Sequence, residues 1–351
     1  MTTLEDVRAA YPVLDQFAYL NSGTNGPLAR STVESLLAEQ LVDLTQGRGG
    51  EPYFSRALAM RDEVRAKLAT HLGAEASQVA LTRSTTDGCN IVLTGLRLGP
   101  EDEIVTTEVE HFGLIGPLHA SGANVVTAPE DKVVEAVTDR TRLVAISHVS
   151  WVTGNSLDPV GIKAETGLPV LVDGAQSAGV LPVEAGEVDY YAVSCQKWLC
   201  GPDVTGALVV ARPEELHVAL PSYFAQTEHE PDGSYTVREG AERFDSGWVG
   251  TPSVAGLSAA LDVHPEWRFE RAAEMAANCR SALEERFEVV TKPDQAGLVT
   301  FRPTSDPTQL VEKLRGQGVI VRELPGRNLI RVSCGYWTSE QDLARLMAAL
   351  N

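Results

Sequence analysis

The sequence has few of the features of a secreted, membrane-bound or metal-stapled protein. It holds only five cysteines in 351 residues, and no two of them form a C-x-x-C pair. Neither a disulfide framework nor a zinc site is therefore expected. The amino terminus lacks the basic and apolar pattern of a signal peptide, and no apolar run is long enough to cross a bilayer. These absences predict a protein of the reducing cytoplasm, without a bound metal and without a membrane partner.

Basic residues are also scarce. The 29 lysines and arginines stand against 48 acidic residues, which gives a formal net charge of −19. Such an excess of negative charge argues against nucleic acid and anionic membranes as partners. With 43% hydrophobic and 22% charged residues, the chain can bury a large core. Its length predicts a major and a minor domain.

Short apolar runs alternate with helix-like segments through most of the chain, which is typical of an α/β protein built from crossover units. Strands are expected at residues 79–82, 103–107, 124–126, 143–148, 170–173, 190–193 and 206–210. Helices are expected at residues 31–44, 53–72 and 133–137. A polar excursion at 226–242 predicts a surface loop or hairpin. The region after about residue 255 predicts helices and a small α+β unit, with strands at 297–301 and 319–322 and a helix at 307–317.

Two residues at predicted strand ends carry the chemistry. Lys197 lies between an apolar strand and a glycine-rich turn, and Asp173 ends an apolar strand 24 residues earlier. In α/β proteins the carboxyl ends of parallel strands bind ligands. Pyridoxal phosphate needs a lysine that bonds to its aldehyde and a carboxylate that keeps its pyridine nitrogen protonated. The pair therefore predicts a pyridoxal phosphate site, whereas a lone lysine would indicate only a solvated turn.

The stretches Val172–Ser177 and Ser194–Lys197 resemble the class V aminotransferase family of fold-type I pyridoxal phosphate enzymes. The resemblance covers nearly the whole chain and is closest to the cysteine/cystine C–S lyases, which are related to cysteine desulfurases. It implies a large domain with a mainly parallel seven-stranded sheet at 15–254, and a small α+β domain formed by 1–14 and 255–351. It also implies a homodimer with shared active sites.

The resemblance assigns cofactor-binding roles to further residues. Those that match family positions are Thr85 and Thr86 in the phosphate-binding turn, His111 stacked on the pyridine ring, Gln176 at the phenolic oxygen, Ser194 and Gln196 at the phosphate, and Thr251 at the phosphate of the neighbouring subunit. Gln196 replaces the histidine that usually precedes the lysine. His111 could also shuttle protons near neutral pH. Some of these positions also have a plainer interpretation: Thr85 and Thr86 as helix caps, His111 as a surface residue, and Thr251 in a turn before a helix.

The predicted substrate end lies in the small domain. Arg331 matches the family's carboxylate-binding arginine, and Arg322 matches a second arginine of the cysteine/cystine lyases. Two arginines would suit a substrate with two carboxylates, such as cystine, although Arg322 would serve equally in a surface salt bridge. Trp151 stands where desulfurases have asparagine, and the lyase branch has tryptophan there too. Ordinary packing is its alternative role.

The reaction expected from these matches is β-elimination. Desulfurases use a cysteine on a loop before the position of Arg331, and residues 323–330 contain none. The chain is therefore predicted to be a pyridoxal-phosphate-dependent C–S lyase that converts L-cysteine, L-cystine or a cysteine S-conjugate to pyruvate, ammonia and sulfide or persulfide. The alternatives are a class V aminotransferase, an epimerase like isopenicillin N epimerase, a desulfurase-like protein without the loop cysteine, and a cofactor-free binding protein that keeps the fold.

Overall fold

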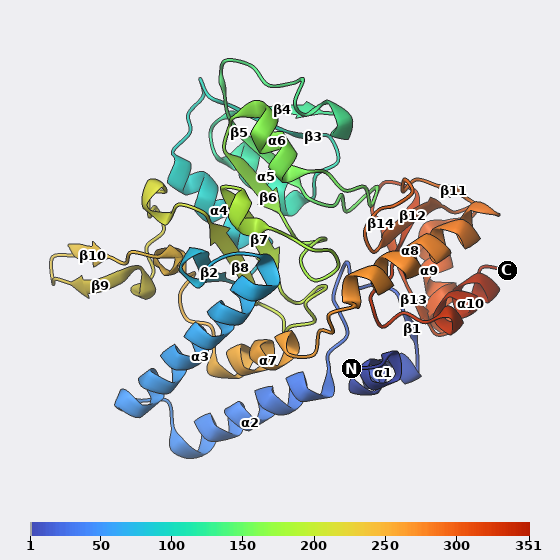
Figure 1. Ribbon diagram of the computed structural model, residues 1–351, viewed down its shortest axis with the longest axis horizontal. Coiled ribbons are helices and arrows are strands. Elements are labelled where there is room, and N and C mark those ends of the chain that lie inside the picture. The colour runs from blue at the N-terminus through green and yellow to red at the C-terminus, as the bar shows by residue number, and fades with distance from the viewer. Residues whose placement is uncertain (1) are drawn as a thin grey trace.

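The computed structural model describes residues 2–351 as two packed α/β units (Figure 1). The α-helices are α1 (Leu4–Ala10), α2 (Arg30–Gln46), α3 (Gly50–Leu72), α4 (Thr85–Leu96), α5 (Phe112–Ala120), α6 (Pro159–Thr166), α7 (Thr251–Leu261), α8 (Arg268–Glu284), α9 (Pro307–Gly316) and α10 (Glu340–Ala349). The strands of the large sheet are β2 (Val79–Thr82), β3 (Glu103–Thr107), β4 (Asn124–Ala128), β5 (Thr141–Ser147), β6 (Val170–Asp173), β7 (Tyr190–Ser194) and β8 (Gly206–Val210).

The large sheet has seven strands in the order β2-β8-β7-β6-β5-β3-β4. Only β8 runs against its neighbours, so the other six strands end at the same edge. Its strands are apolar on both faces because helices cover both. Along β5, Val144 and Ile146 pack with α3, α6 and α7, whereas Leu143 and Ala145 pack with α4 and α5. Burial on both faces explains why these strands read as continuous apolar runs.

The smaller unit is built on an antiparallel sheet. Its strands are β11 (Glu288–Val289), β12 (Leu298–Arg302), β15 (Leu329–Ser333) and β14 (Arg322–Leu324), in that order. Helices α8, α9 and α10 cover it. The amino-terminal strand β1 (Ala18–Tyr19) pairs in parallel with β13 (Val319–Ile320), and Leu20 joins the same core. The chain's first residues are thus fastened to its carboxyl-terminal part. The division at 14/15 and 254/255 stays a prediction.

Most predicted elements form, with two exceptions. The strand expected at 319–322 is divided into β13 and β14, which belong to different sheets. A helix was expected at residues 133–137, but the chain makes the short 3-10 helix η3 (Glu130–Lys132) and then turns. Only two backbone bonds support the turns, from Ala136 N–H to Lys132 O and from Val137 N–H to Val134 O, and so few bonds cannot sustain a helix. The excursion at 226–242 contains the hairpin β9 (Gln226–His229) and β10 (Tyr235–Val237), which projects from the molecule (Figure 1).

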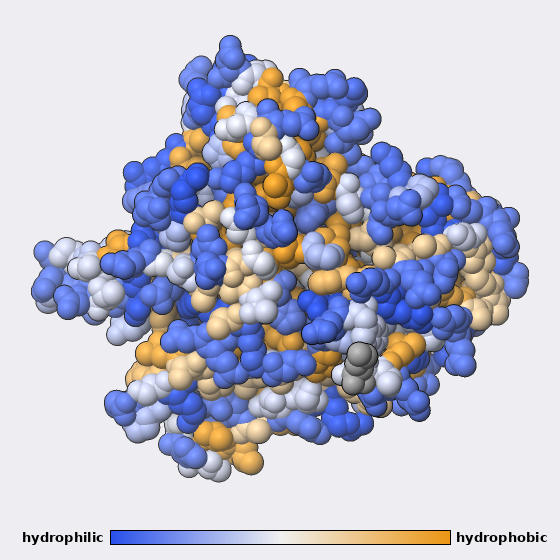
Figure 2. All heavy atoms as spheres, viewed as in Figure 1, coloured by the Kyte–Doolittle hydropathy of each residue, from blue (hydrophilic) through white to orange (hydrophobic). Residues whose placement is uncertain are grey.

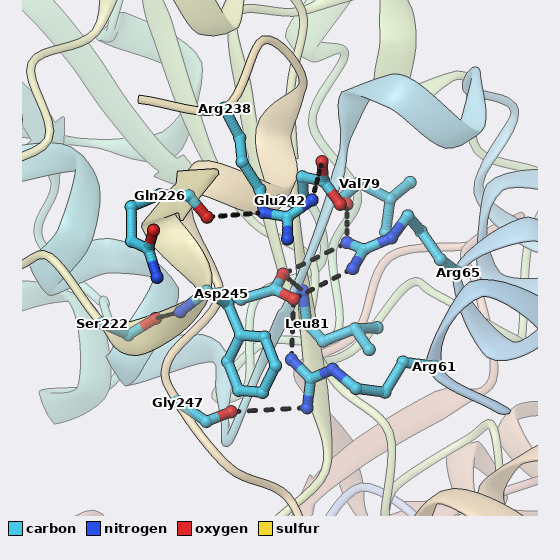
Figure 3. Close-up of polar contacts among 11 residues, drawn as sticks. Arg61, Arg65, Val79, Leu81, Ser222, Gln226, Arg238, Glu242, Asp245 and Gly247 are labelled. Carbon is cyan, nitrogen blue, oxygen red and sulfur yellow. Dashed lines mark hydrogen bonds and ion pairs between the residues drawn. The ribbon is translucent and has the colours of Figure 1, made fainter. Parts of the chain in front are cut away.

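A buried ionic network ties the segment that follows this excursion to the edge strand β2 (Figure 3). The Asp245 carboxylate accepts hydrogen bonds from Arg61 at 2.7 Å, from Arg65 at 2.9 Å and from Leu81 N–H at 2.7 Å. All three charged side chains are buried. Ser246 N–H then donates to Leu81 O. The segment covers an edge that would otherwise expose unpaired strand groups, and it fixes the chain that leads to Thr251.

Candidate active site

The carboxyl edge of the large sheet brings Asp173 and Lys197 together. Asp173 is the last residue of β6, and its backbone pairs with Ala192 of β7, the strand that leads to Lys197. The Asp173 carboxylate is 4% exposed and accepts from Ala175 N–H at 2.9 Å. Burial lowers the pKa of Lys197 to about 8; the Asp173 charge opposes this shift, and the charges of Arg331 and Arg322 add to it. The amine is therefore poised to react near neutral pH.

The turn that carries Lys197 is held by backbone bonds and by an amino-terminal loop. Gly201 N–H donates to Cys195 O, and Gly26 N–H donates to Gln196 O at 2.8 Å. A Cβ at position 26 would overlap the Lys197 carbonyl oxygen, so only glycine allows this approach. The glycine-rich loop before α2 thus forms one wall of the site.

The predicted phosphate turn lies beside this lysine. Thr85 is the first residue of α4, and both its N–H and its hydroxyl bond to Ser194 Oγ at 2.9 Å. The Thr86 hydroxyl faces Gly113, where a Cβ would lie 2.6 Å from it. No partner within residues 2–351 is recorded for the Thr86 N–H. A helix start with a free N–H and two hydroxyls is suited to an anion.

His111 and Trp151 border the same edge. His111 caps α5, and its Nδ1 accepts from Gly113 N–H at 3.0 Å. Desolvation by the surrounding chain and the charge of Lys197 lower the pKa of His111, which favours a neutral ring. The imidazole meets the Trp151 indole edge to face, with centroids 5.1 Å apart. These contacts fix the orientation of the imidazole.

Glu110 is a site residue that the sequence reading did not single out. Its carboxyl accepts from the Thr107 hydroxyl at 2.8 Å and from Ser147 N–H at 3.1 Å. Ser147 is the register partner of Asp173, so Glu110 ties the ends of β3 and β5 beside the Asp173 carboxylate. Burial raises the pKa of Glu110 to about 7. The feature of the sequence that points to Glu110 is its position between a predicted strand and His111.

Gln176 is held on both sides of its amide. Its Nε2 donates to Gly23 O at 2.8 Å, and its Oε1 accepts from Trp198 Nε1 at 3.0 Å. One N–H of the amide is left for a further acceptor. The structure thus brings Gln176 to the wall formed by the glycine-rich loop, and its predicted contact with a phenolic oxygen stays a prediction.

Arg322 and Arg331 lie side by side as a cross-strand pair of β14 and β15. The Thr24 hydroxyl accepts from Arg322 Nη1 at 3.0 Å and from Arg331 Nη2 at 3.5 Å. Arg331 is 1% exposed and also donates to Trp151 O at 3.2 Å. Within residues 2–351, no carboxylate lies within ion-pair distance of either guanidinium. Burial and the charge of Arg322 lower the pKa of Arg331 to about 9. A bound anion would therefore stabilise the charged form of this guanidinium.

Thr251 is not part of this cluster. It begins α7, is buried, and donates its hydroxyl to Asp43 Oδ2 of α2 at 3.0 Å. Asp43 in turn pairs with Arg56. Among the predicted site residues, Thr251 alone has no recorded contact with the Lys197 surroundings in the described chain. A role for it in the same chain's site has no support here.

Buried polar atoms around Lys197 fit a pyridoxal phosphate group. Gln196 Oε1, Trp151 Nε1 and Arg331 Nε are buried without a hydrogen-bond partner in the described chain. Such groups are costly unless a ligand or water pairs them. The lysine matches the aldehyde of the cofactor, the buried carboxylate matches its ring nitrogen, and the helix start matches its phosphate. The two arginines match the carboxylate of an amino acid.

This arrangement, on the carboxyl edge of a mainly parallel sheet, is that of a pyridoxal phosphate enzyme. The family model described as aminotransferase class-V matches residues 32–345, so the chain belongs to that family. Cysteine desulfurase CsdA of Escherichia coli is 30% identical over 79% of this chain and 75% of its own. Isopenicillin N epimerase of Amycolatopsis lactamdurans is 30% identical over 94% of each chain.

Solved structures agree with this assignment. The cystine C–S lyase C-DES, in complex with its reaction product cysteine persulfide, superposes with a TM-score of 0.89 at 29% identity over 97% of this chain and 98% of its own. A C-DES mutant with glycine covalently linked to its PLP cofactor gives 0.91 at 29% identity, over 98% of each chain. The predicted family, fold and pyridoxal phosphate cofactor are confirmed, and the relatives agree with a carbon–sulfur lyase.

Two absences bear on other kinds of site. Within residues 2–351, no helix is long and apolar enough to cross a membrane. The same part of the chain has no group of three or more histidine, cysteine, aspartate or glutamate side chains placed to hold a metal.

Proposed function

We propose that this chain is a pyridoxal-phosphate-dependent C–S lyase. Its reaction is β-elimination on L-cysteine, L-cystine or a related cysteine S-conjugate, and its products are pyruvate, ammonia and sulfide or a persulfide. The observation that carries the proposal is that Lys197 and Asp173 lie together with an arginine pair that has no carboxylate partner among residues 2–351. An amine, a buried carboxylate and an anion grip are what an amino-acid substrate requires.

Pyridoxal phosphate, when bound, supplies an aldehyde for the substrate amine and a ring that withdraws electrons from the α-carbon. Lys197 would hold the cofactor through its amine, and its free amine would accept the proton from the α-carbon. Asp173 keeps the proton on the pyridine nitrogen. Arg331 grips the α-carboxylate, and this grip holds the α-proton toward Lys197. The electron pair of the α-carbon–hydrogen bond would form a double bond to the β-carbon, while the electron pair of the β-carbon–sulfur bond would leave with sulfur. Addition of one water to the three-carbon product would then give pyruvate and ammonia.

The cysteines favour elimination over desulfuration. A desulfurase needs a reactive thiolate above the cofactor, and the connection between the two arginines is a tight hairpin in which Leu324 pairs with Leu329. All five cysteines are buried. Burial raises the pKa of Cys195 to about 12, so this thiol, next to the Lys197 turn, stays protonated and unreactive.

Product analysis with a Lys197→Ala control tests the proposal. Purified holoenzyme given L-cystine should form pyruvate and ammonia in equal amounts, and Lys197→Ala should form neither. Loss of the α-hydrogen with inversion and no pyruvate would instead assign an epimerase. Conversion of the cofactor to its amine form would assign an aminotransferase. Turnover by Lys197→Ala equal to that of the parent would refute the site.

We also propose that two copies share their active sites. Within residues 2–351, Thr251 bonds to Asp43 and has no contact with the surroundings of Lys197. Beside it, α2 presents an apolar stripe of Val33, Leu37, Leu41 and Leu44 that is 40–77% exposed. Figure 2 shows such apolar atoms on the outer surface over α2. A second copy that covers this stripe would bring Thr251 toward the partner's phosphate. Light scattering should give the mass of a dimer, and Leu37→Glu with Leu41→Glu should give a monomer; a monomeric parent would contradict the shared site.

A further inference from the structure

In the part of the chain that the structure describes, Thr24 has the one hydroxyl that bonds to both arginines of the site. Its Oγ donates to Asn21 Oδ1 at 2.9 Å, so its lone pairs face the two guanidiniums. Arg322 and Arg331 donate to this same oxygen. A hydroxyl has two acceptor positions, and both are used. The Thr24 hydroxyl therefore bonds to both guanidiniums and links two side chains of like charge.

The loop around Thr24 is rigid because it is bonded to the strand that carries Arg331. Thr24 N–H donates to Asn21 O at 2.9 Å, and Gly23 N–H donates to Ser333 Oγ at 3.2 Å. Ser333 N–H donates to Leu20 O at 2.8 Å. A Cβ on Gly23 would lie 2.7 Å from Arg331 Nη2, so the loop packs tightly on the guanidinium. The hydroxyl thus keeps its place relative to both arginines.

The two adjacent guanidiniums have no carboxylate partner in the described chain, so two positive charges are left to be balanced. Two like charges held side by side repel each other, and the repulsion is stronger in a buried site than in water. A ligand with one carboxylate leaves one of these charges unbalanced, whereas a ligand with two balances both. This difference is expressed only if both guanidiniums stay in place, and Thr24 supplies the contact that keeps them there.

We propose that Thr24 is a positioning residue that holds Arg322 and Arg331 together and thereby selects substrates with two carboxylates. The inference rests on the proposed function, because it takes the arginine pair as the substrate grip. Within residues 2–351, Thr24 is the only side chain recorded in hydrogen-bond contact with both guanidiniums.

A matched pair of ligands tests this selection. S-carboxymethyl-L-cysteine and S-carbamoylmethyl-L-cysteine have the same shape and differ by one carboxylate charge. Their dissociation constants are measured by calorimetry on the cofactor-free protein, and KM and kcat are measured separately on the holoenzyme. The variants are Thr24→Val, which keeps the shape without the hydroxyl, Thr24→Ser, which keeps the hydroxyl, and Arg322→Gln as a reference for complete loss.

The parent should bind the carboxymethyl ligand more tightly, and Thr24→Val should reduce this preference about 10-fold, the size of one charge-assisted hydrogen bond. The change should appear in KM more than in kcat, and Thr24→Ser should restore the preference. An unchanged preference in Thr24→Val would overturn the proposal, as would equal weakening of both ligands. If Thr24→Val does not fold, Thr24→Ala, which also removes the hydroxyl, takes its place, and an unchanged preference in Thr24→Ala would overturn the proposal.

Failure of the proposed function would look different. A parent that prefers the carboxymethyl ligand, with the preference lost in Thr24→Val, but forms no pyruvate from either would keep the role of Thr24 and refute the lyase. A parent that forms pyruvate from both ligands without preference would keep the lyase and refute the role of Thr24.

Discussion

The pKa of Lys197 gives a quantitative prediction about reactivity. An exposed lysine with its ordinary pKa of 10.5 has about 0.03% free amine at pH 7, whereas a pKa of about 8 gives about 9%, a gain of roughly 300-fold. In the cofactor-free protein, Lys197 should react with a limiting amount of an amine reagent at a rate whose pH midpoint lies near 8. Lys132, whose pKa the bond to Glu135 raises, is the internal reference. Mass spectrometry of peptides gives both rates in one sample.

Two substitutions should move this midpoint in opposite directions. Asp173→Asn removes a negative charge that raises the pKa of Lys197, so the midpoint should fall. Arg322→Gln removes a positive charge that lowers it, so the midpoint should rise. If Lys197 of the parent protein has the same midpoint as Lys132, burial does not raise its reactivity. If neither substitution moves the midpoint, the neighbouring charges are not a cause of the reactivity.

Three further predictions concern stability. Asp245→Asn should lower the free energy of unfolding by about 3–5 kcal/mol, because it leaves Arg61 and Arg65 buried without their carboxylate. In the same denaturant titration, Glu242→Gln, at a half-exposed pair with Arg238, should change stability by less than about 1 kcal/mol; equal effects would contradict the network. Burial raises the pKa of Glu110 from its ordinary value of 4.5 to about 7, so the folded state favours the protonated carboxyl. Its contribution to the free energy of unfolding is therefore complete below pH 4.5 and falls by up to about 1.4 kcal/mol per pH unit as pH rises to 7. Glu110→Gln should flatten this decline in thermal melts, and an unaltered slope would count against it. Burial lowers the pKa of His264 to about 3 from 6.5, so stability should fall as pH drops below 6.5, and His264→Asn should weaken that fall; an identical acid profile would exclude this histidine as its source.

The residues that the sequence predicted best lie at the ends of buried strands. Asp173 and Lys197 follow apolar runs, and strands buried on both faces produce such runs because each face meets a helix. Because β6 and β7 are parallel neighbours, both residues then lie at the same carboxyl edge of the sheet. The same local signal failed at 133–137, where apolar residues lie in turns and too few backbone bonds form for a helix.

The contacts that sequence reading did not reach join distant segments. Thr24 meets Arg322 and Arg331 only because β1 pairs with β13 and Asn21 bridges to Ser333. The residue pattern of the loop around Thr24 does not indicate this contact. Glu110 gave a weak signal before His111, but its bonds to Ser147 depend on the neighbouring strand β5. Contacts between functional side chains that are far apart in the sequence can be identified only when the fold is known.

The most direct test of the central claim is the visible absorbance of the purified holoenzyme before and after L-cystine is added, with pyruvate assayed in the same tube. The account predicts a coloured protein whose absorbance changes on addition, together with pyruvate, and predicts that Lys197→Ala loses the original band and the product. A colourless protein after incubation with pyridoxal phosphate would contradict the cofactor site. A coloured protein that forms no pyruvate from L-cystine, L-cysteine or cysteine S-conjugates would contradict the lyase.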